Sequence, residues 1–187
     1  MIKYNGTRFK IYLFFAVVLL AGVLIGALVS GILPVEKCEE IVLPIKNPGQ
    51  KNHGFVFPGS FLRCIKPVLF MWVCGFSNIA VYCNMIAVLY KGGVLGVAIG
   101  AILKAYGTGQ GILVSVCGVM PQYFVFIPVL MYVCTAIFEY SMSKQNRKRK
   151  LINYVLHLVI ALMGCLLAAL TDTYVTSLLL RLCMNGE

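Results

Sequence analysis

The chain has 187 residues, of which 60% are hydrophobic and 12% charged, and its formal net charge is +10. A soluble domain has about 25% charged residues, so this chain has too few polar side chains to cover its apolar ones, and lipid must solvate part of its surface. The composition excludes an ordinary soluble domain and predicts a single all-α, polytopic membrane domain over residues 1–187. The basic residues lie beside apolar runs, which argues against nucleic-acid binding and for contact with membrane lipid.

The first apolar run, residues 11–33, contains 23 positions without a charge and is long enough to cross a bilayer core of about 30 Å. The apolar region of a cleaved signal peptide would be shorter, at about 7–15 residues. Small residues recur at every fourth position of the run and predict close packing against another membrane helix: Gly22, Gly26 and Ser30. Basic residues precede the run and place its start in the cytoplasm: Lys3, Arg8 and Lys10.

Residues 34–66 form a polar segment with four prolines, which argue against a long helix. We expect this segment to be an extracytoplasmic loop, too short for a catalytic domain with its own core. It contains Cys38 and Cys64, which either form a disulfide or remain free, and their spacing leaves both states open.

The second span is predicted over residues 67–90, where 24 positions have no charge, and Lys91-Gly92-Gly93 is expected to end it on the cytoplasmic side. Residues 94–106 would then form a helix of about 20 Å, which is less than a full crossing. A further run, residues 112–138, contains Pro121 and Pro128. Residues 94–138 therefore form either a hairpin of two crossings or a segment that dips into the bilayer and returns to the same side.

A basic cluster at residues 144–150 holds five of the sixteen Lys and Arg residues and predicts a cytoplasmic loop over residues 139–150. The last span is expected over residues 151–182, with an interruption at residues 171–174, so that the C-terminus is extracytoplasmic. Five membrane helices result, one of them a short glycine-striped helix in a hairpin. The loop at 34–66 also has five basic residues, and this observation opposes the predicted orientation.

The glycine-rich stretch KAYGTGQG, residues 104–111, is the one segment that suggests a nucleotide loop. A phosphate-binding loop would need a preceding strand and a Lys after its glycines, and this stretch has neither. We interpret it as a helix break in which glycine provides a positive φ: Gly107, Gly109 and Gly111. Three earlier glycines recur at every fourth position and would form a flat helix face for close packing in the interior: Gly92, Gly96 and Gly100.

Candidate chemical groups are sparse. His53 and His157 are the two histidines, and no nucleophile–base pattern or Cys-x-x-Cys pair accompanies them, so we expect no enzyme, no cofactor and no metal site. Asp172 is expected near the outer boundary of the last span, either as an interfacial acid or helix cap or in a buried pairing or ion site. Lys104 is the candidate partner for such a pairing.

Four segments follow one another in an order that resembles the stage II sporulation protein M family, over residues 61–180. They are FLRCIKPVLFMWVCGF, YKGGVLGVAIG before the glycine break, GVMPQYFVFIPVLMY with its two prolines, and ALTDTYVTSLLL with its acidic residue. The first helix and the loop agree with the family in layout alone. Thr176 stands where the family often has a proline, and this departure concerns only the end of the last helix.

The resemblance implies a multi-pass protein of endospore-forming bacteria that acts in engulfment, at the sporulation septum of the mother cell. It implies a non-enzymatic scaffold that recruits and localises cell-wall (peptidoglycan) hydrolases, namely stage II sporulation proteins D and P. From exposure, we expect the docking surface in the loop at 34–66 and at the exposed span ends; a homo-oligomer stays open. The alternative is a transporter or permease-like module, which is motivated by the broken short helix and by Asp172.

Overall fold

The computed structural model of the chain describes residues 2–34, 36–38, 42, 53–77, 79–142, 147–176 and 178–179. Nearly all of these residues are helical. Their main elements, in chain order, are α1 (Ile2–Ile32), α3 (His53–Cys74), α4 (Ala80–Tyr106), α5 (Thr108–Gly118), α6 (Met120–Met142), α7 (Arg147–Leu170) and the π-helix η1 (Thr171–Thr176).

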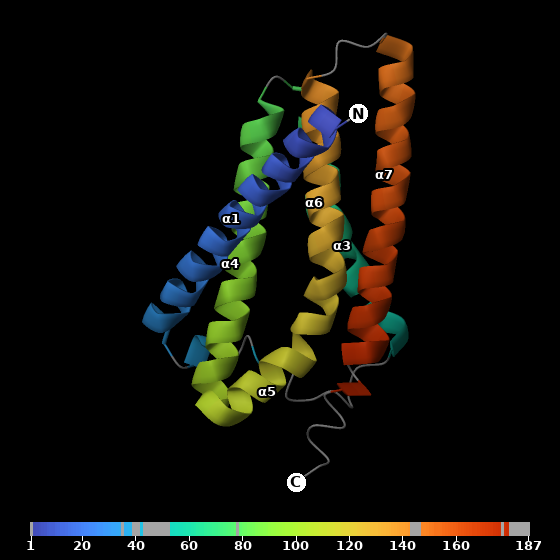
Figure 1. Cartoon of the computed structure of the whole chain (residues 1–187). Coiled ribbons are helices and arrows are strands. Elements are labelled where there is room, and N and C mark those ends of the chain that lie inside the picture. Colours follow the sequence, from blue (N-terminus) through green and yellow to red (C-terminus); the bar gives the residue numbers. More distant parts are fainter. Residues whose placement is uncertain are drawn as a thin grey trace.

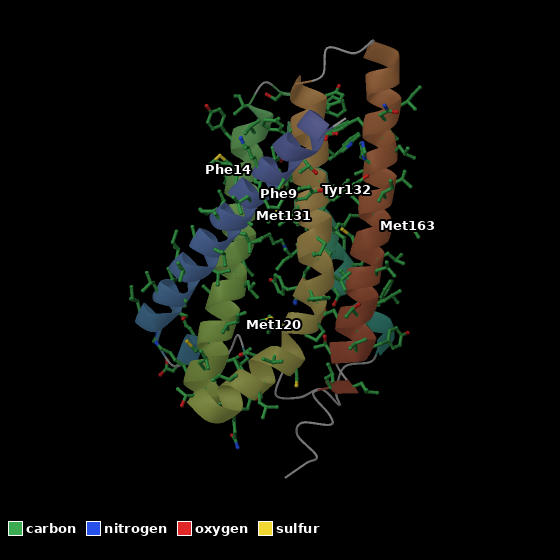
Figure 2. The ribbon with its side chains drawn as sticks, in the orientation of Figure 1. Phe9, Phe14, Met120, Met131, Tyr132 and Met163 are labelled. Atoms are coloured by element: carbon green, nitrogen blue, oxygen red, sulfur yellow. The ribbon has the colours of Figure 1, made fainter. Side chains whose placement is uncertain are left out.

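Within the described chain, five helical segments are long and apolar enough to cross a membrane. Large apolar side chains cover their outer surfaces, as Phe14 and Met163 do in Figure 2, with 47% and 59% of their surface exposed. Met131, in contrast, is buried in the interior of the bundle. The prediction of an all-α polytopic membrane protein with about five membrane helices is confirmed, over Phe9–Ile32, Phe57–Cys74, Ala80–Tyr106, Met120–Tyr140 and Ile152–Thr176.

The five spans run alternately up and down in one bundle (Figure 1). The start of α1, the α3–α4 turn and the α6–α7 connection lie at one end, at the top of Figure 1, which we call the upper end. The end of α1, the α4–α5 bend and η1 lie at the other, lower end, and α5 runs across that end. The chain therefore enters the first span and leaves the last one on opposite sides of the bundle.

The main core lies where α3, α4, α6 and α7 meet. It contains large and fully buried side chains from each of these helices: Met71, Val88, Leu130, Ile137 and Tyr154. A second apolar cluster lies at the lower end, where Cys38 and Val42 pack with Leu95, Ile102 and Val114 of α4 and α5. Cys38 and Val42, which follow α1 in the chain, are thus held against the α4–α5 corner.

The glycine faces of α1 and α4 pack directly against each other. A Cβ atom added at Gly92 would collide with the carbonyl oxygen of Leu19 and lie 3.2 Å from the Cα of Gly22, and one at Gly96 would collide with the carbonyl of Val23. The contact is reciprocal, because a Cβ at Gly26 would collide with the backbone of Gly93. Close helix packing through these glycines was predicted from their spacing. A Cβ at Gly100 would also meet α1, at the side chain of Ser30.

The predicted boundaries of the second span are wrong. Helix α3 begins at His53 and includes both Pro58 and Pro67, so the segment expected to be a loop as far as residue 66 is helical from residue 53 onward. The predicted span over residues 67–90 contains a turn, closed by hydrogen bonds from the backbone N–H of Gly75 to Met71 and of Ser77 to Cys74. Gly75 allows Tyr154 to pack closely against this turn, because a Cβ at residue 75 would collide with the hydroxyl of Tyr154.

Helix α4 is a full-length span rather than a short helix. It continues without a break through Lys91, Gly92 and Gly93, which were expected to end a span, and the predicted short helix at residues 94–106 is its second half. Of the two arrangements left open for residues 94–138, the structure has the hairpin: α4 crosses, α5 lies across the lower end, and α6 returns.

The bend after α4 depends on one of the three predicted hinge glycines. Gly107 ends α4 with a φ of 77°, and α5 starts at the next residue. Gly109 lies within α5 in open space, and Gly111 packs α5 on Leu103 of α4. The two predicted prolines both lie in α6, Pro121 in its first turn, where a missing N–H is tolerated, and Pro128 in its interior.

The predicted basic loop over residues 139–150 is shorter than expected. Helix α6 continues to Met142 and α7 begins at Arg147, so helical residues occupy both ends of that range. Residues 143–146 lie outside the described residues.

Candidate functional site

Polar side chains from α3, α4, α6 and η1 meet inside the layer formed by the five apolar spans. Three contacts define this inner polar cluster: Ser60 Oγ donates to Asp172 Oδ2 (2.5 Å), Gln122 Nε2 donates to Cys64 Sγ (3.5 Å), and Lys91 Nζ donates to the carbonyl of Arg63 (3.1 Å). Polar and ionisable groups at membrane depth are costly and usually mark a function. The inner polar cluster is therefore the candidate functional site.

Lys91 lies near the middle of α4, about half-way through a membrane span. Its partner, the carbonyl of Arg63, would normally accept a hydrogen bond from the N–H four residues later, but that residue is Pro67, which has no N–H. The ammonium group of Lys91 satisfies this carbonyl and also lies 5.1 Å from the ring centroid of Phe126, a cation–π distance. Lys91 is not predicted as a site residue from the sequence, because a charge usually marks the end of a span. The signal that could have indicated it is the proline four residues after Arg63.

Asp172 is presented to α3 by the π-helix η1. The hydroxyls of Thr171 and Thr173 donate to the carbonyls of Leu167 and Ala169, both at 2.9 Å, and so satisfy backbone acceptors where the helix widens. A π-helical turn places a side chain differently from a regular α-helix and often occurs at functional sites. Here it directs the carboxylate of Asp172 toward Ser60. The π-helix lies where an interruption of the last span was predicted, at residues 171–174.

Lys104 does not pair with Asp172, and this expectation was wrong. The ammonium group of Lys104 donates to the carbonyls of Gly31 (2.7 Å) and Leu33 (3.0 Å), at the end of α1. The last carbonyls of a helix have no partner within the helix and attract a positive charge. Lys104 therefore ties the end of α1 to the end of α4, whereas Asp172 belongs to the inner polar cluster.

We expect Asp172→Asn and Ser60→Ala each to lower the free energy of unfolding by about 1–2 kcal/mol, because each removes a hydrogen bond to a charged, partly buried group. In the double variant the two losses should not add, leaving a coupling of about 1 kcal/mol. The measurement is detergent-induced unfolding followed by circular dichroism. Ser30→Ala provides the control: Ser30 bonds locally to Ala27, so its effect should add to that of Asp172→Asn. Additivity in the Ser60 pair would contradict the contact.

Cys38 and Cys64 are both free, so of the two states left open the structure has the reduced one. Cys64 lies in α3 beside Gln122, and Cys38 is buried in the second apolar cluster at the lower end. His157 lies in α7 with its Nδ1 2.5 Å from the hydroxyl of Tyr132 on α6, and it therefore joins these two helices. The side chain of His53 is outside the described residues.

Two further features lie away from the inner polar cluster. Asn84 of α4 is fully buried, and neither atom of its amide has a hydrogen-bond partner among the described residues. An apolar groove of about 510 Å³ lies between α1 and α4, and Gly22, Tyr90, Gly93 and Val97 are among its lining residues. The groove can take an acyl chain or another helix, but none of its lining residues is charged.

These features together define a polytopic α-helical membrane protein: five spans, a glycine-packed pair of helices, and an inner polar cluster at membrane depth. The chain belongs to the stage II sporulation protein M family, since that family's sequence model matches residues 12–177, most of the chain. The match confirms the resemblance and extends it to the first helix. The chain is therefore a sporulation-related membrane protein. No curated protein and no solved structure matches it significantly.

Proposed function

We propose that the protein is a non-enzymatic membrane scaffold that recruits and localises peptidoglycan hydrolases, stage II sporulation proteins D and P, during engulfment. The observation on which this proposal depends is the family match over residues 12–177. A scaffold needs a rigid body in the membrane and an exposed surface for its partners. The glycine contacts between α1 and α4 and the tie from Lys104 to the end of α1 support the first requirement.

The lower end of the bundle is our proposed docking surface. Cys38 and Val42, which follow α1 in the chain, are almost completely buried there. Beside them, α5 exposes large apolar side chains at Ile112, Leu113 and Val116. An exposed apolar surface of this kind suits a protein partner.

The orientation we propose follows from the basic residues beside the spans. The cluster at 144–150 joins α6 to α7 at the upper end of the bundle, so the upper end, with the N-terminus, faces the cytoplasm of the mother cell. The lower end, where η1 ends the last span, then faces the space between the septal membranes, where peptidoglycan hydrolases act.

The structure changes one of the two observations that motivated a transporter. The helix at residues 94–106 is half of a full span, whereas Asp172 remains in the inner polar cluster, bonded to Ser60. The two functions are compared by measuring solute flux into proteoliposomes that contain the purified protein. Solute flux that depends on Asp172 would favour the transporter over the scaffold.

The scaffold proposal is tested by exchanging residues 43–52 for a Gly-Ser sequence of equal length, with Cys38 and Val42 retained as anchors. We expect septal recruitment of fluorescent stage II sporulation protein P to fall about tenfold, which corresponds to about 1.4 kcal/mol of binding free energy. The control exchanges residues 143–146, between α6 and α7 in the chain, for a Gly-Ser sequence of equal length. The membrane level of each variant is measured by immunoblot. Unchanged recruitment with residues 43–52 exchanged would refute this docking surface.

A further inference from the structure

One face of α3 places positive charges on the outside of the bundle at mid-membrane depth. Lys66 lies at the middle of the apolar span Phe57–Cys74, and Arg63 lies one turn before it. Both side chains are exposed. The carbonyl of Arg63 is bound by Lys91, which is itself near the middle of α4. The positions of both residues within their helices therefore indicate the same depth, near the middle of the spans.

Charges at this depth need a partner. A Lys or Arg at the centre of a membrane helix costs about 2.5–3.5 kcal/mol on insertion scales and normally faces the interior or pairs with an acid. In the described spans, Asp172 is bound by Ser60, and Glu139 lies in the last turn of α6, close to the upper end. Among the residues that the structure describes, no acid pairs with Arg63 or Lys66.

The exposed face of α3 has the spacing of a helix-packing seam. Its buried stripe consists of Ser60, Cys64, Val68 and Met71, which point into the core. A second stripe, exposed throughout, recurs at intervals of four, three, four and three residues, which is the pattern that one helix presents to another. We call it the α3 seam: Gly59, Arg63, Lys66, Phe70 and Val73.

The residues of the α3 seam favour a helix as the occupant. Gly59 has no atom within 4 Å of an added Cβ and leaves room for a close approach. Phe70 and Val73, with 56% and 61% of their surface exposed, provide apolar contact on the other side of the two charges. A lipid phosphate would sit about 15 Å from the bilayer centre, at the headgroup level, and therefore away from Lys66.

We propose that the α3 seam docks a membrane-spanning helix of another protein that has a carboxylate at mid-bilayer depth. The carboxylate pairs with Arg63 and Lys66, and the flanking residues of that helix pack on Gly59, Phe70 and Val73. A second copy of this chain does not fit, because its membrane acids are bound or lie at another depth. The inference rests on the proposed recruiting function.

The test uses the full chain, fluorescently labelled, in phosphatidylcholine vesicles with a synthetic apolar helix that has one central Glu. The matched probe has Gln at that position, and association is measured by energy transfer. We expect the Glu helix to bind about tenfold more tightly than the Gln helix, a difference of about 1.4 kcal/mol. The double variant Arg63→Gln, Lys66→Gln should remove this difference, while Lys10→Gln, an exposed charge on α1, should retain it.

Equal binding of the Glu and Gln helices would overturn the proposal. Two further measurements test the other occupants, a lipid and a second copy of the chain. The proposal would also be overturned if spin-labelled phosphatidylglycerol were retained through Arg63 and Lys66, or if the chain self-associated through these two residues. Circular dichroism of the double variant checks that it folds. If the double variant does not fold, the difference in affinity of the native chain for the Glu and Gln helices still tests the proposal. If the Glu and Gln helices bind equally while exchange of residues 43–52 still abolishes recruitment, the α3 seam is rejected as a docking site and the proposed function is retained.

Discussion

Gly96→Ile is expected to separate α1 from α4 and to lower the free energy of unfolding by about 3 kcal/mol, at the top of the usual range for overpacking. The cost is high because the atom in the way of the first added carbon is the backbone carbonyl of Val23, which cannot rotate aside as a side chain can. Isoleucine is tolerated in helices, so a change in helix propensity cannot account for the loss. The measurement is the midpoint of detergent-induced unfolding, followed by circular dichroism.

Gly31→Ile is the matched control for this prediction. Gly31 lies in the last turn of α1, and a Cβ there would meet no atom within 4 Å. We expect this variant to stay within about 0.5 kcal/mol of the native protein, as surface substitutions usually do. If both variants unfold at the same midpoint, the glycine faces are not the contact between α1 and α4.

Gly107→Ala is expected to have the second-largest effect and to lower the free energy of unfolding by about 1–3 kcal/mol. The backbone at this residue has a φ of 77° and a ψ of 172°, a region that is essentially restricted to glycine. An alanine must leave this region, so the direction in which α5 departs from α4 has to change. Unfolding experiments report the cost, and the distance between spin labels on α4 and α5 reports the change in direction.

Gly109→Ala provides a control of opposite sign, two residues away. Gly109 lies inside α5 with no neighbour near its added Cβ. Alanine there should stabilise the protein by up to about 1 kcal/mol through its higher helix propensity. Destabilisation by both variants to the same degree would show that the stretch tolerates no side chain at all, contrary to the specific role of Gly107.

Both substitutions concern features that the sequence already indicates, because they depend on local spacing. The four-residue recurrence of Gly22 and Gly26, and of Gly92, Gly96 and Gly100, places small residues on one face of each helix whatever surrounds it. The bend at Gly107 likewise depends on a single backbone conformation. The orientation proposed here also rests on charges that are adjacent in sequence, at residues 144–150.

The span boundaries could not be predicted in the same way, because charges were taken to mark the ends of spans. Arg63 and Lys66 lie inside α3, and Lys91 lies inside α4. The charge of Lys91 is accommodated by a carbonyl on another helix, which Pro67 leaves open. No window along the sequence contains both partners, so the compensation becomes visible only when α3 and α4 lie side by side.

Composition and local periodicity are sufficient to predict a bundle of membrane helices with one glycine-packed face and a sharp bend, because they control burial in lipid and backbone freedom. Which polar groups meet depends on the folded arrangement: Ser60 contacts Asp172 across 112 positions, and Lys104 contacts Gly31 across 73. The first pair satisfies an acid within the membrane spans, and the second gives the unpaired carbonyls at the end of α1 a positive partner. Which partner it finds depends on how the helices cross.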